Sequence, residues 1–346
     1  MLNCKSHCFY ILFLVLLAGT SSCSKSGHER YISETDTTYS LDIRNISKKI
    51  NASPSNPELY YTRSNTFYFE DNFKQALLDI DYALKLDSLN PLYFYSRGKY
   101  LMAGDTANAR EAENSFKKAI AFKPDFTDAL SELAKLYLAK QNYQGSEELY
   151  QRINKLDPSN PLSYFYLGII AKEQGDTSKA IQLFEKSLVY DDKYYNAIMQ
   201  LGNIYAESHD AKALVFFDRA IKVNEFSDEA LYAKGLYLQK ENLYKDAVAL
   251  YETVARMNPA HILCRYNLGY INGLFGNYNK AIEYLDQTIE LAPDYADAYT
   301  LRGTMKEQLK NSTGAYNDYK HALQLDEHQD LAEKGLKRIN ITISMP

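Results

Sequence analysis

The chain has 346 residues, of which 46% are hydrophobic and 24% are charged, and its formal net charge is −5. This mixture is typical of a folded globular protein and argues against disorder over most of the length. Acidic and basic residues are mixed along the sequence without a concentrated basic block, so we expect no nucleic-acid partner.

Residues 1–22 are predicted to be a signal peptide. Lys5 supplies a positive charge, and the uncharged apolar run 8–18 (CFYILFLVLLA) follows it. At about 1.5 Å per residue, this run covers only about half of a bilayer core of about 30 Å. It is therefore too short to span a membrane and is typical of a signal peptide.

Small residues follow the apolar run and end in Cys23, after which the sequence becomes polar. This segment resembles the lipobox of bacterial lipoproteins, in which the cysteine sulfur is lipidated and the peptide is cut before it. The resemblance makes Cys23 the lipidation site, although Thr20 stands where the family usually has Leu. The alternative is ordinary cleavage after Ser22, which would leave Cys23 unmodified.

The residues after Cys23 bear on location. Ser24 resembles the second residue of lipoproteins sent to the outer membrane, where retained ones carry Asp, and no acidic cluster of the kind that directs surface export follows. We therefore expect an outer-membrane lipoprotein of the cell envelope that faces the periplasm. The orientation and the lipidation itself stay open.

A period of about 34 residues, typical of a helical repeat, dominates the rest of the sequence. Alignment of the alanines that precede aromatic residues gives repeat starts at Pro57, Pro91, Thr127, Pro161, Tyr195, Asp228, Ile262 and Ala296. The spacing is constant except that the second repeat is slightly longer and the fifth slightly shorter. A fixed period of this length indicates an array of similar structural units.

The period and its small-residue columns resemble the tetratricopeptide (TPR) family, whose unit is two antiparallel helices. Position 8 is Gly, Ala or Ser in every repeat, as in Gly168, and position 20 is Ala or Ser, as in Ala180. Position 24 is large, as in Phe184, and is expected to fill the space beneath the next repeat. The resemblance implies an all-α, right-handed superhelical solenoid of about eight helix-turn-helix repeats.

The resemblance and the period divide the chain into five parts: the signal peptide 1–22, a polar tether 23–38, an N-terminal capping helix 39–56, eight repeats over 57–329, and a C-terminal capping helix and tail 330–346. The N-terminal cap is a degenerate half repeat, and the C-terminal helix is expected over 330–339 with a basic last turn. Extra residues in 104–113 and a deletion near His209 predict two irregular turns.

In the TPR family the first helix of each repeat lines a concave groove. Carried over position by position, the partner-binding residues are Tyr61, Asn65, Tyr68, Phe69, Tyr95, Lys99, Phe165, Ile169, Lys172, Tyr232, Leu236, Lys240, Tyr266 and Tyr270. Tyrosine rings on such a surface would be binding anchors. The alternative for each ring is that it packs against the neighbouring repeat.

Two charged features complete the comparison with the family. The carboxylate clamp of chaperone-binding relatives is not reproduced, because position 5 holds Tyr61 where the clamp needs Lys. Arg63 with Asp79, and Arg302 with Asp318, occupy positions 7 and 23 and are predicted to pair within their own repeats.

The sequence carries no recognisable catalytic or metal-binding pattern. Three of the 4 cysteines lie at or before Cys23, and Cys264 is predicted to be a half-buried thiol without a histidine partner. The 6 histidines have no metal-ligand spacing, and phosphate-binding or nucleophile-elbow motifs are absent from the sequence. We expect no enzyme activity, no metal, no cofactor and no small-molecule substrate.

The sequence therefore favours a membrane-anchored, non-catalytic scaffold or adaptor that binds protein or peptide partners in the envelope through its groove. The alternatives are a periplasmic peptide-binding chaperone or secretion pilot, and a secreted TPR protein without a lipid. Fold alone does not choose among these functions.

Overall fold

The computed structural model describes residue 32 and residues 36–104 and 108–344. The predicted signal peptide, Cys23 and nearly all of the predicted tether lie outside the described residues. The chain divides into two compact units, Met1–Ala129 and Leu130–Pro346, and each is treated separately below.

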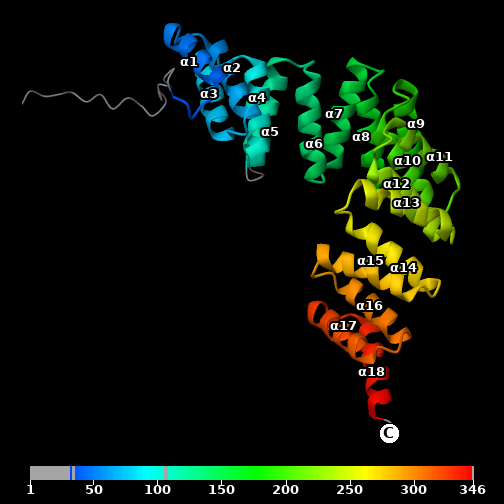
Figure 1. Ribbon diagram of the computed structural model, residues 1–346. Helices are drawn as coiled ribbons and strands as arrows, with labels where there is room; N and C mark the ends of the chain where they lie inside the picture. Colours follow the sequence, from blue (N-terminus) through cyan, green and yellow to red (C-terminus); the bar gives the residue numbers. More distant parts are fainter. Residues whose placement is uncertain (1–31, 33–35, 105–107, 345–346) are drawn as a thin grey trace, which may run out of the picture. The chain divides into compact units, whose positions relative to one another are not determined.

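The described residues form α-helices joined by short turns (Figure 1). The first unit contains α1 (Leu41–Ala52), α2 (Pro57–Phe69), α3 (Phe73–Leu86), α4 (Pro91–Gly104), α5 (Ala109–Phe122) and the start of α6 (Thr127–Ala139). The second unit contains the rest of α6 and α7 (Tyr143–Leu156), α8 (Pro161–Glu173), α9 (Thr177–Tyr190), α10 (Tyr195–Glu207), α11 (Lys212–Val223), α12 (Asp228–Lys240), α13 (Tyr244–Met257), α14 (Ile262–Leu274), α15 (Tyr278–Leu291), α16 (Ala296–Gln308), α17 (Ser312–Leu325) and α18 (Asp330–Ser344).

The helices pack as hairpins, and within each unit neighbouring hairpins pack on one another, as α3 does on α4 and α9 on α10. In the first unit α2 pairs with α3 and α4 with α5, and in the second α8 pairs with α9, with the same pairing continuing to α16 and α17. The first helix of each hairpin begins at the residue from which a repeat was counted in the sequence. The predicted all-helical repeat fold is confirmed.

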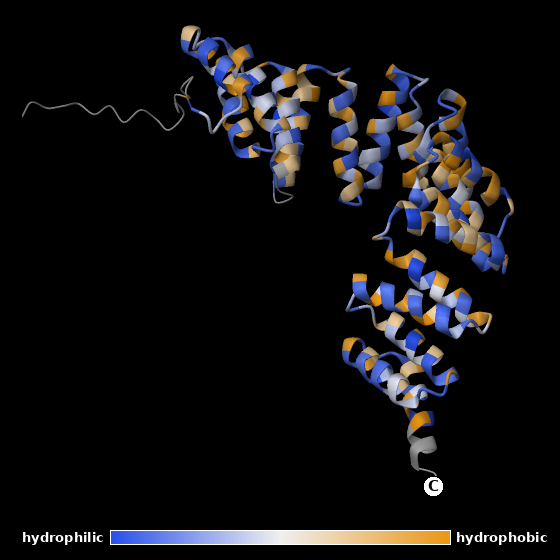
Figure 2. Cartoon of the chain, in the orientation of Figure 1, coloured by the Kyte–Doolittle hydropathy of each residue, from blue (hydrophilic) through white to orange (hydrophobic). Residues whose placement is uncertain are grey.

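Hydrophobic and hydrophilic residues are interleaved along the described helices (Figure 2). This interleaving lets each helix bury one stripe against its neighbours while the opposite stripe stays in water. In the second unit, for example, Ala180, Phe184, Ala197 and Leu201 belong to one buried cluster shared by adjacent hairpins.

The same type of turn joins the two helices in several of the hairpins. Its central residue has a positive φ, as in Gly175 (φ 81°), Gly276 (φ 76°) and the non-glycine Asn242 (φ 63°). The next residue is often an Asn or Asp that caps the second helix; the Asp176 side chain, for instance, accepts from the Lys179 backbone amide. A left-handed residue followed by an N-cap ends one helix and starts the next.

Position 8 of the first helix lies against position 24 of the second helix in the same repeat. A β-carbon added to Gly168 would lie 2.7 Å from a ring carbon of Phe184, and one added to Gly235 would lie 2.8 Å from the Tyr251 ring. We expected the position-24 residue to fill space beneath the next repeat. The structure shows that it also lies directly on position 8 of its own repeat, which explains why that column holds small residues.

The ion pairs predicted at positions 7 and 23 are confirmed. The Arg63 guanidinium donates to both carboxylate oxygens of Asp79, at 2.6 and 2.8 Å, and the two side chains are only 9% and 10% exposed. Arg302 makes the same two-point contact with Asp318, at 3.0 and 2.7 Å.

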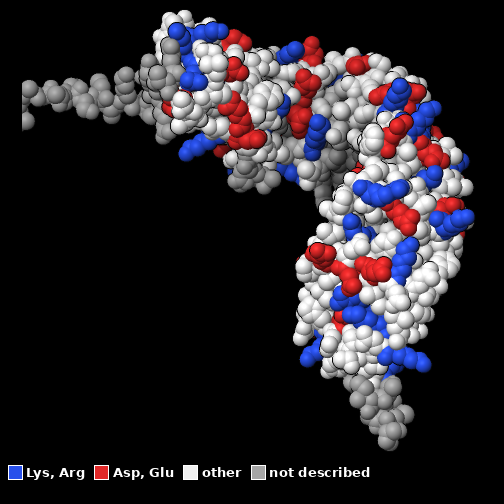
Figure 3. All heavy atoms as spheres, viewed as in Figure 1, with Lys and Arg blue, Asp and Glu red and all other residues white. Residues whose placement is uncertain are grey.

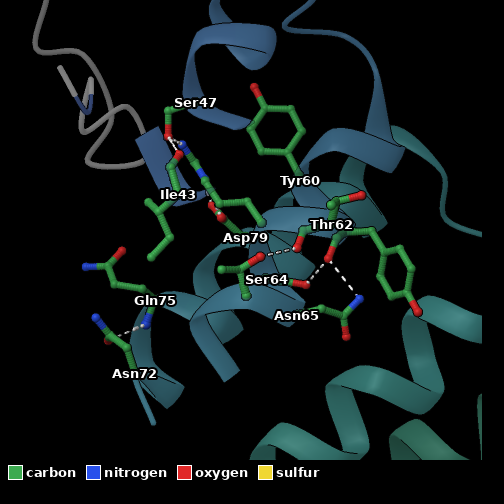
Figure 4. Close-up of polar contacts among 12 residues, drawn as sticks. Ile43, Ser47, Tyr60, Thr62, Ser64, Asn65, Asn72, Gln75 and Asp79 are labelled. Carbon is green, nitrogen blue, oxygen red and sulfur yellow. Dashed lines mark hydrogen bonds and ion pairs between the residues drawn. The ribbon is translucent and has the colours of Figure 1, made fainter. Parts of the chain in front are cut away.

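The N-terminal cap is bound through the first of these pairs. The Arg63 Nη1 group donates to the Ser47 hydroxyl of α1 at 2.9 Å, so a single guanidinium joins α1, α2 and α3. Its two partners, Ser47 and Asp79, are labelled in Figure 4. Ile43, which is fully buried, adds an apolar contact from α1 to the same cluster. The predicted half repeat is thus a helix that closes the first hairpin.

The C-terminal cap differs from the prediction. α18 extends to Ser344 instead of ending at Ile339, so Lys337 and Arg338 lie away from its last turn. The Arg338 guanidinium instead donates to both carboxylate oxygens of Glu307 in α16, each at 2.9 Å. This contact and the Tyr319 hydroxyl lower the pKa of Glu307. The expectation that Lys337 and Arg338 stabilise the C-terminal end of the helix dipole was wrong. The helix continues past both residues, and Arg338 pairs with a neighbouring helix.

The irregular repeats are accommodated near the turns. α4 ends at Gly104 and α5 begins at Ala109, so the extra residues of the second repeat lie between the two helices of a hairpin. In the fifth repeat the turn centres on His209 at φ 57°, and α11 begins at Lys212. α11 has 12 residues where α9 and α13 have 14, so the deletion shortens the start of one helix.

Candidate partner-binding surface

We define the inner face of a repeat as the side of its first helix that carries positions 5, 9, 12 and 13. This face was predicted to bind partners. It lies on α2 and α4 in the first unit, and the positions predicted in the second unit lie on α8, α12 and α14.

In the first unit the rings of α2 pack on the rings of α4. Tyr61 lies against Tyr93 with ring centroids 5.1 Å apart, and Tyr68 stacks on Tyr100 at 4.8 Å. Tyr61 and Tyr68 stay half-buried, and Phe69 is 80% exposed at the end of α2. This inner face therefore combines fixed rings with one freely exposed ring.

Lys99 lies among these rings. Its ammonium nitrogen is 5.4 Å from the centroid of Tyr68 and 5.5 Å from the centroid of Tyr95. Tyr95 in turn packs on Phe126, with centroids 5.0 Å apart. Both distances from the ammonium fall within the range of cation–π attraction.

The amide of Asn65 is occupied by the protein itself. The Tyr100 hydroxyl donates to its oxygen at 2.8 Å, and its nitrogen donates to the Tyr61 carbonyl at 3.2 Å. Burial raises the pKa of Tyr100 to about 12, so the hydroxyl remains a donor at neutral pH. Asn65 thus fixes the α2–α4 contact through both ends of its amide.

The prediction that Phe165 lines a binding groove was wrong. Phe165 is 8% exposed and packs on Phe184, Tyr194 and Tyr166, with centroids between 5.2 and 5.7 Å away. Because two rings from outside its own helix cover it, this residue belongs to the core of the second unit.

The two remaining residues predicted on α8 are half-buried. Ile169 packs against the cluster that contains Phe184. The Lys172 ammonium donates to the Gln200 side chain of α10 at 3.1 Å. Both side chains therefore contribute to the contact between successive hairpins.

On α12 and α14 most of the predicted rings contact their neighbours. Tyr232 lies 4.8 Å from the His261 ring, and its hydroxyl accepts from Asn267 at 3.4 Å. Tyr266 packs on Tyr295 at 5.2 Å, and burial raises its pKa. Tyr270 and Leu236 are half-buried, whereas Lys240 is exposed. Tyr232 and Tyr266 thus pack against the next repeat, which was the alternative that the sequence left open, and each also keeps part of its surface accessible.

Two recurring uses of tyrosine were missed in the sequence. At position 4, the hydroxyls of Tyr60, Tyr164 and Tyr299 each donate to the carbonyl of the proline six positions earlier, at 3.0 to 3.1 Å. The recurrence of Pro and Tyr at this fixed spacing could have revealed the contact.

At position 24, a buried tyrosine donates its hydroxyl to position 12 on the inner face. Tyr251 donates to Gln239 at 2.9 Å, and Tyr319 donates to Glu307 at 2.7 Å. In the third repeat position 12 is Leu138, and the buried Tyr150 hydroxyl has no hydrogen-bond partner among the described residues. Two of these three tyrosine hydroxyls are therefore satisfied by position 12 of their own repeat.

Cys264 is fully buried, which corrects the expectation of a half-buried thiol. Burial raises its pKa to about 12, so the thiol stays protonated and unreactive at neutral pH. Its side chain packs in the buried apolar cluster that contains Tyr251.

The described part of the chain gives no sign of a metal centre or a membrane span. Across residues 36–104 and 108–344, no group of three or more His, Cys, Asp or Glu side chains could hold a metal ion. Within the same ranges, no helix has both the length and the hydrophobicity needed to cross a bilayer. On the face seen in Figure 3, basic and acidic side chains are interspersed without a single-sign patch.

The contrast between Phe165 and Phe69 gives a direct test of which inner-face residues are accessible. Phe165→Ala should lower the free energy of unfolding by about 3–5 kcal/mol, because it empties a buried site. Phe69→Ala should change it by less than about 0.5 kcal/mol, because the ring lies in water. Thermal melts followed by circular dichroism measure both; equal melting temperatures for the two variants would contradict the assigned burial.

Two family models match the chain. The model described as the second ARM domain of tetratricopeptide repeat protein 21 matches residues 48–307, and a model described as tetratricopeptide repeat matches residues 296–329. The first match covers well over half of the chain.

Individual relatives match the sequence at low identity. A TPR repeat-containing protein of Methanocaldococcus jannaschii is 22% identical over 307 residues, which is 81% of this chain and 54% of that protein. The human protein O-mannosyl-transferase TMTC1 is 27% identical over 191 residues, which is 53% of this chain and 21% of that protein. The chain thus spans less than two thirds of the length of either protein.

A solved structure shares the fold. The C-terminal part of a TPR repeat-containing protein from Cytophaga hutchinsonii superposes with a TM-score of 0.59 at 18% identity, covering 71% of this chain and 99% of that one. TPR proteins generally act as protein-interaction scaffolds, and their repeats are typically non-catalytic. The hairpin geometry, the close position-8 contacts and the family match over residues 48–307 together show that this chain belongs to the tetratricopeptide-repeat family.

Proposed function

We propose that this protein is a non-catalytic scaffold or adaptor, anchored to a membrane of the cell envelope, that holds protein or peptide partners on the inner faces of its repeats. Membership of the TPR family supports the protein-binding role. The arrangement of the inner face of α2 and α4 supports binding at this surface. Packed tyrosines surround Lys99 there, and the adjoining Phe69 ring is exposed.

The tyrosines of this face can still bind a partner although each packs on a neighbouring ring. Tyr61, Tyr68 and Tyr95 are half-buried, so each ring is fixed by a neighbour and still keeps accessible surface. A ring that is already fixed loses little conformational entropy when a partner covers it. Fixed aromatic rings of this kind are frequent anchors in protein interfaces.

The anchoring part of the proposal rests on the sequence up to and including Cys23. A short apolar run followed by small residues and a cysteine is the pattern of a lipidated signal peptide. A lipid with several acyl chains would hold the protein on the membrane without any spanning helix. We place the anchor in the outer membrane, with the repeats facing the periplasm.

The anchor is tested by metabolic labelling with a fatty-acid probe in a Gram-negative host. The wild-type chain should incorporate the label, and Cys23→Ala should lose it. Cys264→Ala is the matched control and should keep the label, because its thiol is fully buried. Label on the Cys23→Ala variant would contradict lipidation at this residue.

The scaffold role is tested by photo-crosslinking in intact cells. A photoreactive residue at Tyr95 or Tyr266 should trap one recurrent protein, whereas the same residue at Val215, which is 65% exposed on the second helix of a hairpin, should not. A broad range of trapped proteins would contradict a dedicated scaffold and favour a peptide-binding chaperone. Equal trapping from Val215 would contradict binding on the inner faces.

A further inference from the structure

Three lysines occupy positions 9 or 12 of the inner faces, and their surroundings differ. The Lys135 ammonium lies 2.8 Å from the Glu132 carboxylate, and the Lys172 ammonium donates to Gln200 at 3.1 Å. Lys99 makes no ion pair or hydrogen bond with the described residues; its ammonium contacts the ring faces of Tyr68 and Tyr95. Of these three lysines, only Lys99 lacks an ion pair or hydrogen bond to a side chain among the described residues.

The two rings beside Lys99 are themselves fixed. Tyr68 stacks on Tyr100 with centroids 4.8 Å apart and also meets Phe73 at 5.7 Å. Tyr95 packs on Phe116 and Phe126, at 6.3 and 5.0 Å. The ammonium is therefore positioned by a rigid aromatic support, and the side chain is half-buried. A cation with part of its hydration removed interacts more strongly with an anion than a fully solvated one does.

The other residues around Lys99 on this inner face are aromatic, aliphatic or uncharged polar. Phe69 is 80% exposed, and Met102 is half-buried. The Asn65 amide is hydrogen-bonded on both its oxygen and its nitrogen. The one acidic residue in α2 and α4 is Glu58, whose carboxylate accepts from the Tyr93 hydroxyl at 3.1 Å. The face thus presents one unmatched positive charge flanked by apolar surface.

We propose that the inner face of α2 and α4 binds an extended polypeptide segment in which an internal Asp or Glu stands next to aromatic or aliphatic residues. The carboxylate pairs with the Lys99 ammonium, and the flanking apolar side chains cover Tyr68 and Phe69 on one side and Tyr95 on the other. This proposal rests on the scaffold function above and names the chemical class of its partner.

The geometry favours a side-chain carboxylate over a chain-terminal one. Apolar surface lies on both sides of Lys99, so a bound segment gains contacts by continuing in both directions. A terminal carboxylate paired with Lys99 would end the segment there and lose the contacts on one of these two sides.

The test uses the mature full-length chain and a display library of random linear peptides. Segments selected by the wild-type protein should be enriched in Asp or Glu beside aromatic or aliphatic residues. Lys99→Met should abolish the acidic enrichment, because it keeps the aliphatic stem and removes the charge. Lys135→Met and Lys172→Met are matched controls and should retain it, because those lysines are bound internally.

The selected acidic peptide is then measured in solution with both ends blocked by acetyl and amide groups. Lys99→Met should weaken its binding about ten-fold or more, as expected for loss of a charge-assisted contact. Added salt should weaken wild-type binding and leave the variant nearly unaffected. Unchanged melting of Lys99→Met, followed by circular dichroism, shows that the variant is folded.

Several outcomes would overturn the proposal. They are an acidic enrichment that survives Lys99→Met, selection of neutral or basic segments, failure of the library to yield any binder, and binding that requires a free carboxyl terminus. The scaffold function fails separately, when crosslinkers at Tyr95 and Tyr266 trap nothing in cells. A partner that is trapped from both positions and still binds Lys99→Met would leave the scaffold intact and remove only the acidic-segment proposal.

Discussion

The contact between position 8 and position 24 of each repeat is the constraint on which the remaining architecture depends. A glycine such as Gly168 lets the Phe184 ring approach the first helix where even one β-carbon would meet it at 2.7 Å. The ring therefore fills the space between the two helices of the hairpin and is itself fully buried. Because the contact recurs at Gly98, Gly202, Gly235 and Gly303, each hairpin has nearly the same internal geometry, and successive hairpins can stack by the same rules.

Polar contacts between hairpins follow from this regular stacking. A cation at position 7 forms an ion pair with the Asp at the place of position 25 in the preceding repeat. The nitrogen–oxygen distances are 2.7 Å for Arg97–Asp81, 2.5 Å for Lys234–Asp218 and 2.6 Å for Arg302–Asp286. Tyrosine hydroxyls at positions 4 and 24 find acceptors in the same repeating manner. With so many charged and hydroxyl groups satisfied internally, an unmatched cation such as Lys99 stands out as a place where a partner can supply the missing charge.

The sequence predicted the features that depend on local pattern. Helix starts, small-residue columns and the Arg63–Asp79 pair follow from the fixed period, because equivalent residues occupy equivalent places in every hairpin. It failed where a neighbouring helix decides the environment. Phe165 and Tyr266 both occupy position 5, yet Phe165 is buried by Phe184 and Tyr194, while Tyr266 stays half-exposed beside Tyr295. Whether a first-helix ring faces solvent depends on side chains from outside its own helix, which a position-by-position comparison does not weigh.

The same reason explains the C-terminal cap. The cluster of Lys337 and Arg338 indicated a helix end, but Glu307 in a different helix accepts Arg338, and α18 continues. Contacts between equivalent positions of the repeat were thus predictable, and contacts that depend on which side chain a neighbouring helix supplies were not. The candidate binding surface is made of both kinds, which is why only part of it could be identified in advance.

A double-mutant cycle at Gly168 and Phe184 tests the central contact most directly. Gly168→Leu should lower the free energy of unfolding by about 1–3 kcal/mol or more, because the added side chain meets the ring. Phe184→Ala should cost clearly less in the Gly168→Leu background than in the wild type, since removal of the ring relieves the clash. Additive effects of the two substitutions, or an unchanged melting temperature for Gly168→Leu, would contradict the account.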